Sequence, residues 1–256
     1  MGELQQLLKC NRFLKNIVII DLLYILEASR WFSETGSRIC KMKQLVWRWI
    51  FFVTGVTTMA LGISMTIKGQ QFGIGPWDVF HVGLYNHLGL SIGTWAILTG
   101  VIIALITMIG TKKFPQLGTW LNIVFIGSFI DVFNWLLPDV TSYISQLIIF
   151  IIGILIAAVG VGIYVSPNVG AGPRDSLMLL LVAKTGWSIK MVRTGIEIIV
   201  ALAGWALGGP VGLGTIIIAL LLGQIVHYSL PWSQKLLNKI SGYTLPYVKK
   251  SVENQS

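Results

Sequence analysis

Two short segments of this sequence combine glycine, proline and aspartate in a way that could bind a small charged molecule. Residues 73–78 and 170–175 both read Gly-x-Gly-Pro-x-Asp, and a short apolar segment follows each copy. A glycine-rich turn that runs into a helix start offers free backbone N–H groups and the positive end of the helix dipole. The second copy adds Arg174 where the first has Trp77. The motif therefore indicates an anion-binding site, more strongly in the second copy.

Ionisable side chains also lie inside an apolar stretch downstream. Glu197 follows Arg193 by four residues, so the two share one face of a helix. Charges at membrane depth are costly and usually face a partner or a cavity. The pair either lines a site together with the two turns or only locks helices together. The candidate substrate-binding residues are Gly73, Gly75, Pro76, Asp78, Gly170, Gly172, Pro173, Arg174, Asp175, Arg193 and Glu197.

Each of these features has a purely structural alternative. In the turns, glycine permits a sharp bend and the aspartate caps the helix that follows. Asp131 and His227 occupy matching positions in two parts of the chain, where they serve proton or ion coupling or only hydrogen-bond between helices. Asp78 and His81 are three residues apart, but a metal site needs more convergent ligands, so we expect no bound metal.

The composition identifies the class of protein. Hydrophobic residues make up 54% of the 256 residues and charged residues 11%, against about 25% charged in a typical soluble domain. Long windows with few charges predict a polytopic membrane protein whose main partner is the lipid bilayer. The net charge of +9 reflects basic residues that flank apolar runs, and we expect no nucleic-acid binding. Without a Walker loop, nucleophile elbow or dinucleotide fingerprint, we expect no enzymatic activity and no cofactor.

The apolar pattern predicts an all-α fold with six spanning helices and two short helices that do not cross. The short helices cover about residues 77–88 and 173–183 and reach only about half of a bilayer. A proline in the first turn favours each helix start. The predicted spans are residues 46–67, 94–109, 117–137, 143–165, 189–207 and 215–230.

Glycines repeat between the two halves of the chain. Gly55 and Gly62 align with Gly153 and Gly160, and Gly127 aligns with Gly223 after a slip of one residue. A pattern kept over roughly 75 residues indicates an internal duplication. Three crossings per half place the lysines at 112–113 in the cytoplasm and Asp139 outside, as the positive-inside rule favours. Because the number of crossings per half is odd, the two halves have opposite orientations in the membrane. They form two inverted three-helix repeats, each with a re-entrant helix.

These features divide the chain into four parts. The repeats cover residues 42–138 and 139–232, and a basic cytoplasmic tail covers 233–256. Residues 1–41 form an amino-terminal extension, which is either a surface helix or the product of a misassigned start codon. Both termini are then cytoplasmic. Cys10 and Cys40 lie in this extension, so we expect no disulfide.

The two motif copies, together with residues 185–193 and 208–215, carry a family resemblance. Over residues 43–232 the chain resembles the YczE/YitT-type group of bacterial integral membrane proteins. The resemblance implies a multi-pass protein of the bacterial plasma membrane, and it implies little about chemistry.

Inverted repeats, interrupted helices and buried charges favour one function class. We expect a small-solute transporter or permease, with its site at the Gly-x-Gly-Pro-x-Asp re-entrant segments. The alternative is a non-transporting membrane accessory or regulatory protein. The sequence does not identify the solute, and it is compatible with a homo-oligomer.

Overall fold

The computed structural model describes residues 42–170 and 172–241. The chain divides into two units, Met1–Val46 and Trp47–Ser256, and the packing described below belongs to the second. The predictions made for residues 1–41, including both cysteines, and for the tail beyond residue 241 lie outside the described residues.

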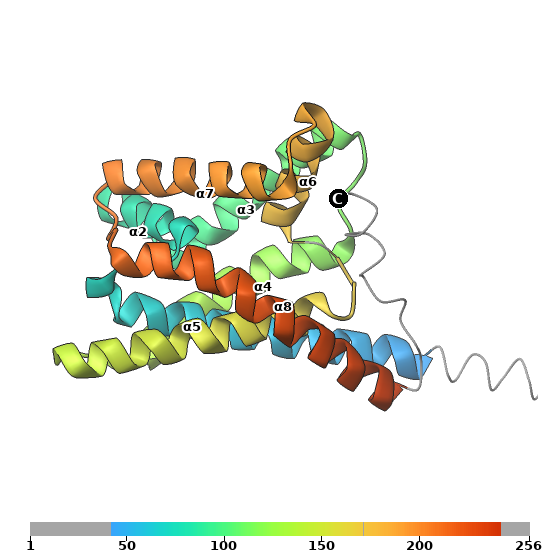
Figure 1. Cartoon of the computed structure of the whole chain (residues 1–256), viewed down its shortest axis with the longest axis horizontal. Helices are drawn as coiled ribbons and strands as arrows, with labels where there is room; N and C mark the ends of the chain where they lie inside the picture. The colour runs from blue at the N-terminus through green and yellow to red at the C-terminus, as the bar shows by residue number, and fades with distance from the viewer. Residues whose placement is uncertain (1–41, 171, 242–256) are drawn as a thin grey trace, which may run out of the picture. The chain divides into compact units, whose positions relative to one another are not determined.

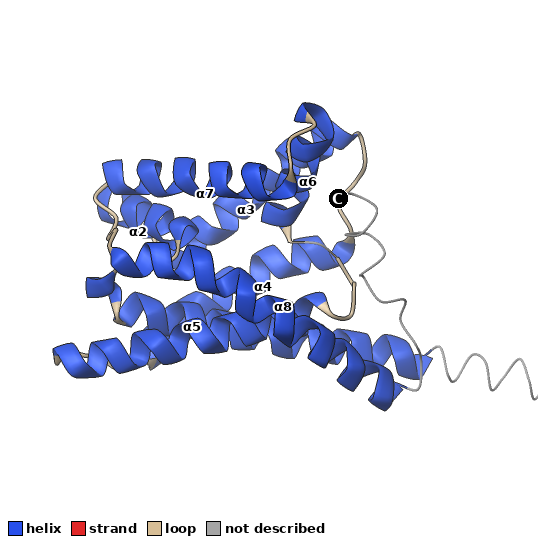
Figure 2. Ribbon diagram, viewed as in Figure 1, coloured by secondary structure: helices blue, strands red, loops and turns tan. Residues whose placement is uncertain are grey.

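Every regular element in the described part of the chain is a helix, as Figure 2 shows. The all-α prediction is therefore confirmed for these residues. In chain order the elements are a first helix Met42–Lys68, η1 Gln70–Phe72, α2 Pro76–Leu88, α3 Ile92–Thr111, α4 Leu117–Leu136, α5 Tyr143–Val165, α6 Pro173–Thr185, α7 Ile189–Ala206 and α8 Leu213–Ser241 (Figure 1).

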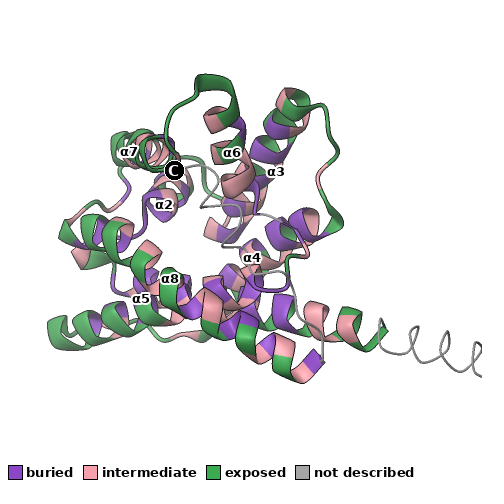
Figure 3. Cartoon of the chain, turned by 45° about the vertical axis from the view of Figure 1, so that its right-hand side comes forward, coloured by how far each residue is buried: buried purple, intermediate pink, exposed green. Residues whose placement is uncertain are grey.

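Five of these helices are long and apolar enough to cross a membrane, namely the first helix, α3, α4, α5 and α8. Their outer faces expose large apolar side chains, such as Ile148 and Ile151 on α5 and Ile216 and Leu220 on α8. Figure 3 shows these exposed faces in green around a buried interior. A surface of this kind is unfavourable in water but fits lipid. The membrane location predicted from composition is thus supported.

The predicted span at residues 189–207 corresponds to α7, which is not among these five helices. Its 18 residues include three charged side chains, Lys190, Arg193 and Glu197, whereas each of the five has an 18-residue window with at most two. Its remaining surface still exposes Ile198 and Ile199.

The two short helices, α2 and α6, begin and end in the same way. Each has 13 residues and carries proline at its start, preceded by an extended glycine, Gly75 or Gly172. Each ends at a glycine with positive φ, +71° at Gly89 and +72° at Gly186, a conformation that side-chain-bearing residues rarely adopt. At 1.5 Å per residue each helix is about 20 Å long, shorter than the roughly 30 Å hydrocarbon core. Neither helix can span a bilayer alone.

Glycines bring the first helix and α5 into backbone contact. A Cβ on Gly62 would overlap the backbone nitrogen of Ala157, and one on Gly160 would overlap that of Met59. One further Cβ, on Gly55, would overlap the backbone of Tyr164. Small residues at such crossings let membrane helices approach closely and gain van der Waals contact.

The two Gly-x-Gly-Pro turns pack against the starts of distant helices. Gly73 lies against Gly212 and Thr215 at the start of α8, while Gly170 lies against Gly118 and Thr119 at the start of α4. The turn at Gly73 is therefore held by a Gly-Thr helix start roughly 140 residues later in the chain, and the turn at Gly170 by one roughly 50 residues earlier.

Two helix pairs differ sharply in how closely they pack. α3 packs along α4, and a Cβ on Gly127 would overlap the carbonyl oxygen of Gly93. α7 and α8 do not pack as a pair in this way. Gly195 on α7 and Gly223 on α8 have no atom within 4 Å of where a Cβ would be. The α7–α8 pair therefore leaves open space beside its glycines, whereas α3 and α4 are in backbone contact.

The last helix is longer than the sequence analysis predicts. α8 continues past the predicted end at residue 230 to Ser241, with Pro231 inside it. A proline inside a helix removes one backbone hydrogen bond and clashes with the preceding turn, but Ser233 and Leu237, one turn apart, are both fully buried. Packing of this face outweighs the proline, so residues 233–241 of the expected tail are helical.

Candidate functional site

Residues from several distant segments surround one cavity of about 530 Å³, which we call the central cavity. It lies among the starts of α2 and α6, the charged face of α7 and the inner face of α8. Nine of the eleven candidate substrate-binding residues line it: Gly75, Pro76, Asp78, Gly172, Pro173, Arg174, Asp175, Arg193 and Glu197.

The other candidate residues lie elsewhere. Gly73 and Gly170 form the turns behind the cavity and contact the starts of α8 and α4. Asp131 on α4 accepts hydrogen bonds from the Ser91 hydroxyl and, at 2.7 Å, from the backbone N–H of Gly93 on α3. His227 is exposed on α8. Asp131 and His227 do not line the central cavity.

The guanidinium of Arg174 places a positive charge at the wall of the central cavity. It lies over the Trp77 ring, 4.8 Å from the ring centroid, in cation–π geometry. Among the described residues it has no ion-pair partner within 4.0 Å. The charges of Asp78, Asp175 and Glu197 act on it from longer range. This guanidinium is available to bind an anionic group.

Buried polar atoms without partners lie around the same cavity. Asp78 is 8% exposed, His81 1% and Asn122 2%. Within the described part of the chain, Asp78 Oδ1, both ring nitrogens of His81 and Asn122 Nδ2 have no hydrogen-bond partner. His81 Nδ1 and Asp78 Oδ1 are 4.0 Å apart, too far for a hydrogen bond. Buried polar groups are nearly always satisfied, so these are the atoms that a bound polar molecule or water would contact.

Other charges around the cavity already have partners. Arg193 Nε donates to Glu197 Oε1 at 3.1 Å. The Asp175 carboxylate interacts with the charges of Arg193 and Arg174 and lies beside the Tyr164 hydroxyl at Gly172. The part of the chain that the structure describes contains no group of three or more His, Cys, Asp or Glu side chains that could hold a metal.

Apolar side chains make up most of the remaining cavity wall. They come from the first helix and from α3, α4, α6, α7 and α8, with Ile63, Ile103, Ile123, Met178, Ile196 and Leu222 among them. The cavity therefore combines a few fixed polar groups with an apolar body, which is the usual design of a small-molecule site.

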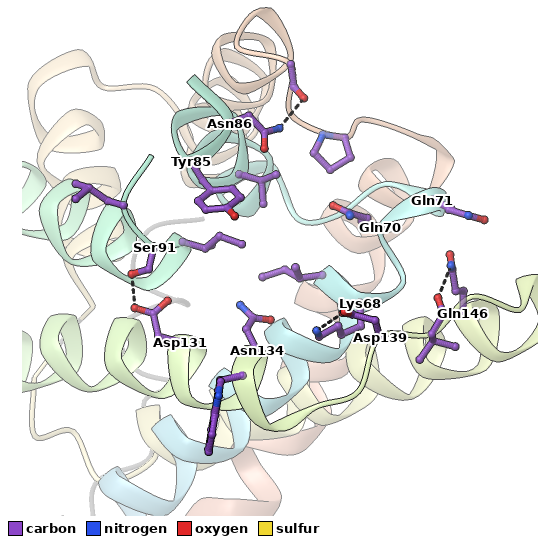
Figure 4. Close-up of a pocket in the computed structure, with 18 residues that line it drawn as sticks. Lys68, Gln70, Gln71, Tyr85, Asn86, Ser91, Asp131, Asn134, Asp139 and Gln146 are labelled. Atoms are coloured by element: carbon purple, nitrogen blue, oxygen red, sulfur yellow. Dashed lines mark hydrogen bonds and ion pairs between the residues drawn. The ribbon is translucent and has the colours of Figure 1, made fainter. Parts of the chain in front are cut away.

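A second pocket of about 940 Å³ is rich in amides, and we call it the amide pocket (Figure 4). In it the Lys68–Asp139 ion pair faces Asn86 and Asn134 across the space. Both amide atoms of Asn134 are buried without partners. The sequence analysis does not predict this pocket. Its side chains come from the ends of separate helices, and no local pattern joins them.

A hydrophobic cluster lies between the central cavity and the amide pocket. Ile63 of this cluster lines the central cavity, and Ile67 and Val82 line the amide pocket. The whole cluster comprises Ala60, Ile63, Ile67, Ile74, Val79, Val82 and Ile130. These side chains separate the two pockets along α2. Residues 78 and 81 of α2 line the central cavity, and residues 82, 85 and 86 line the amide pocket.

Asn122 and Tyr164 are site residues that the sequence analysis misses. Each is one of several polar side chains in a mainly apolar span, Asn122 on α4 and Tyr164 on α5. Such residues commonly serve interhelical hydrogen bonds, so their position in the sequence alone carries little signal.

Comparison with known proteins places the chain among membrane proteins. The uncharacterized membrane protein YczE of Bacillus subtilis is 48% identical over 198 residues, which cover 77% of this chain and 92% of that protein. An uncharacterized protein of Haemophilus influenzae is 36% identical over 60% of this chain and 71% of its own length. The uncharacterized protein YyaS of Bacillus subtilis is 29% identical over 72% of this chain and 92% of its own length. No solved structure matches the chain.

A family model also matches most of the chain. The model for a family of unknown function, DUF6198, matches residues 46–231. This range contains both motif copies and every residue named around the central cavity. The chain therefore belongs to the DUF6198 family, the YczE-type group of membrane proteins.

Proposed function

We propose that the protein is a small-solute transporter of the bacterial plasma membrane whose substrate binds in the central cavity. One observation carries the proposal. Charged residues from α2, α6 and α7 converge, among membrane-spanning helices, on one cavity that also holds buried polar atoms without partners. Burying unsatisfied polar groups costs free energy, and a polar substrate would satisfy them.

The proposed architecture is two inverted repeats with α2 and α6 as re-entrant helices. α2 packs with α7 of the other half, and α6 packs with α3, so each short helix has the matching partner in the opposite half. The turns before α2 and α6 also contact matching Gly-Thr helix starts. In this arrangement α7 is the fifth of six crossings, and Arg193 and Glu197 on it line the cavity. Interrupted helices at matching places in two halves are typical of transporter sites.

Two spaces in series suit alternating access. The hydrophobic cluster contributes Ile63 to the wall of the central cavity and Ile67 and Val82 to the wall of the amide pocket. In the proposed cycle this cluster is the closed gate of the described conformation. Movement of α2 relative to α4 would open it and close the cavity on its other side.

Filling the central cavity should stop transport without unfolding the protein. Ala219 on α8 lines the cavity, and its neighbour Leu220 is 64% exposed on the outer face. We expect Ala219→Trp to reduce uptake into proteoliposomes to the level of protein-free liposomes, and Leu220→Trp to leave it unchanged. The assay uses radiolabelled leucine, 4-methylpentanoate, 3-methylbutylamine and glycerol.

Two outcomes of this assay would count against the proposal. Wild-type uptake by the Ala219→Trp protein would show that the solute does not pass through the central cavity. Absence of uptake above protein-free liposomes for the whole panel would favour the accessory role instead.

The orientation of the loops tests the inverted arrangement. In a background with both native cysteines replaced by serine, we expect an impermeant thiol reagent to label Asp139→Cys in intact cells and not Lys113→Cys. The physical reason is the excess of lysine and arginine on cytoplasmic loops. Both positions are exposed in loops between helices, so a cysteine at either is accessible to the reagent, and the ion pair with Lys68 is the contact that Asp139→Cys removes. Labelling at residue 113 would contradict the inverted arrangement.

A further inference from the structure

We propose that the central cavity recognises a small zwitterion with an apolar side chain, binding its carboxylate at Arg174 and its ammonium group at Asp78. The assignment names the substrate class of the transporter and in that respect rests on the proposed function. Binding itself can be measured independently of transport.

Arg174 provides the carboxylate half of the site. It lies in the first turn of α6, where backbone N–H groups have no partner within the helix, and over the Trp77 ring at 4.8 Å. A guanidinium binds a carboxylate through two parallel hydrogen bonds. No carboxylate of the described residues lies within 4.0 Å of the Arg174 guanidinium, so its N–H groups can bind a carboxylate of the ligand.

Asp78 provides the ammonium half. Its side chain is buried at the start of α2, and Oδ1 has no hydrogen-bond partner among the described residues. A primary ammonium group carries three hydrogens, which matches the unpartnered acceptors of Asp78 and His81 on one face of α2. His81 is 1% exposed with neither ring nitrogen bonded, so it can accept the second hydrogen through one of them.

The remaining charges explain why a zwitterion fits better than an anion or a cation. Arg193 and Glu197 pair with each other, and the charge of Asp175 interacts most strongly with that of Arg193. Arg174 and Asp78 are left as opposite charges that act on each other without a direct ion pair. An anion would satisfy only Arg174, and a cation only Asp78. A molecule with both charges satisfies both.

The apolar wall accepts the rest of the molecule. Isoleucine, leucine and methionine side chains from six helices cover most of the cavity beyond the two charged groups. A volume of about 530 Å³ admits a side chain the size of leucine or phenylalanine. Glycine, with the same charges, would leave this surface uncovered and should bind less tightly.

Equilibrium binding to the purified, folded protein tests the proposal. The probes are leucine, phenylalanine and two analogues of leucine that each lack one charge, 4-methylpentanoate and 3-methylbutylamine. We expect leucine or phenylalanine to bind saturably, and each analogue to bind about ten- to a hundredfold more weakly, because each loses one charge-assisted contact. This comparison needs only the wild-type protein, so it does not depend on whether a variant folds.

Two substitutions assign the ends of the ligand. Arg174→Gln should abolish the preference for leucine over 3-methylbutylamine, and Asp78→Asn should abolish the preference for leucine over 4-methylpentanoate. Lys113→Gln and Lys184→Gln remove charges outside both pockets and should bind leucine as the wild type does.

The outcomes separate this inference from the transport proposal. No saturable binding of either amino acid, or equal binding of leucine and its single-charge analogues, would overturn the zwitterion assignment. Uptake of another solute that Ala219→Trp abolishes would then leave transport standing. Saturable leucine binding without uptake of any probe would support the site and overturn transport.

Discussion

Gly127→Ala is expected to be strongly destabilising, whereas Gly223→Ala at the corresponding position of α8 is expected to be neutral or stabilising. A Cβ on Gly127 would overlap the Gly93 carbonyl oxygen and the Ile97 side chain, so α3 and α4 must move apart. Overpacking of this kind costs ~3 kcal/mol of unfolding free energy. On Gly223 the Cβ meets no atom within 4 Å, and alanine favours a helix by ~1 kcal/mol over glycine.

The measurement is the unfolding free energy in detergent micelles. Gly195→Ala on α7 is a second control, because it also has open space around its Cβ position. Equal stability of the Gly127→Ala and Gly223→Ala proteins would show that the two helix pairs pack alike, against the structure.

Glu197→Gln is expected to reduce stability because it leaves Arg193 without its partner. The ion pair joins Arg193 Nε and Glu197 Oε1 at 3.1 Å, one turn apart on α7. A charge at the centre of a membrane helix costs ~2.5–3.5 kcal/mol, and we expect about 2 kcal/mol here because the Arg193 side chain is 46% exposed. The double substitution Arg193→Gln with Glu197→Gln removes both charges and should restore most of the loss.

Transport by the double variant distinguishes a structural pair from a site pair. Both residues line the central cavity, and the charge of Glu197 acts on Arg174. We therefore expect the double variant to be stable and to lose at least about 90% of uptake, a loss of about 1.4 kcal/mol or more in transition-state stabilisation. A stable and fully active double variant would remove Arg193 and Glu197 from the site.

Local chemistry explains why much of the fold could be predicted from the sequence. α5 begins at residue 143 and ends at 165 as the apolar pattern predicts. The starts of α2 and α6 follow from Gly-Pro pairs, which fix an extended residue before a helix. The convergence of Arg174 with Arg193 follows from the loop between α6 and α7, because a chain that turns back brings its two limbs together.

The remaining features depend on contacts between segments that are distant in sequence. Gly127 and Gly223 occupy matching places in the glycine pattern, yet only Gly127 is in a tight helix contact. Pro231 suggests a helix end, yet the buried Leu237 keeps α8 helical. Asn122 belongs to the site only because α4 passes behind the start of α6. No local pattern encodes these outcomes.

The open pair α7 and α8 would make the proposed cycle sensitive to the mechanical state of the bilayer. α7 and α8 are separated, whereas the corresponding helices α3 and α4 are in contact. Bringing α7 and α8 together would therefore reduce the area that this pair occupies in the membrane plane. Lateral tension does work on any change of in-plane area and favours the larger state. Stretched or thinned membranes should therefore hold α7 and α8 apart. Thicker, more ordered bilayers should promote their closure, so the solute flux of the proposed cycle would depend on the lipid composition of the host membrane.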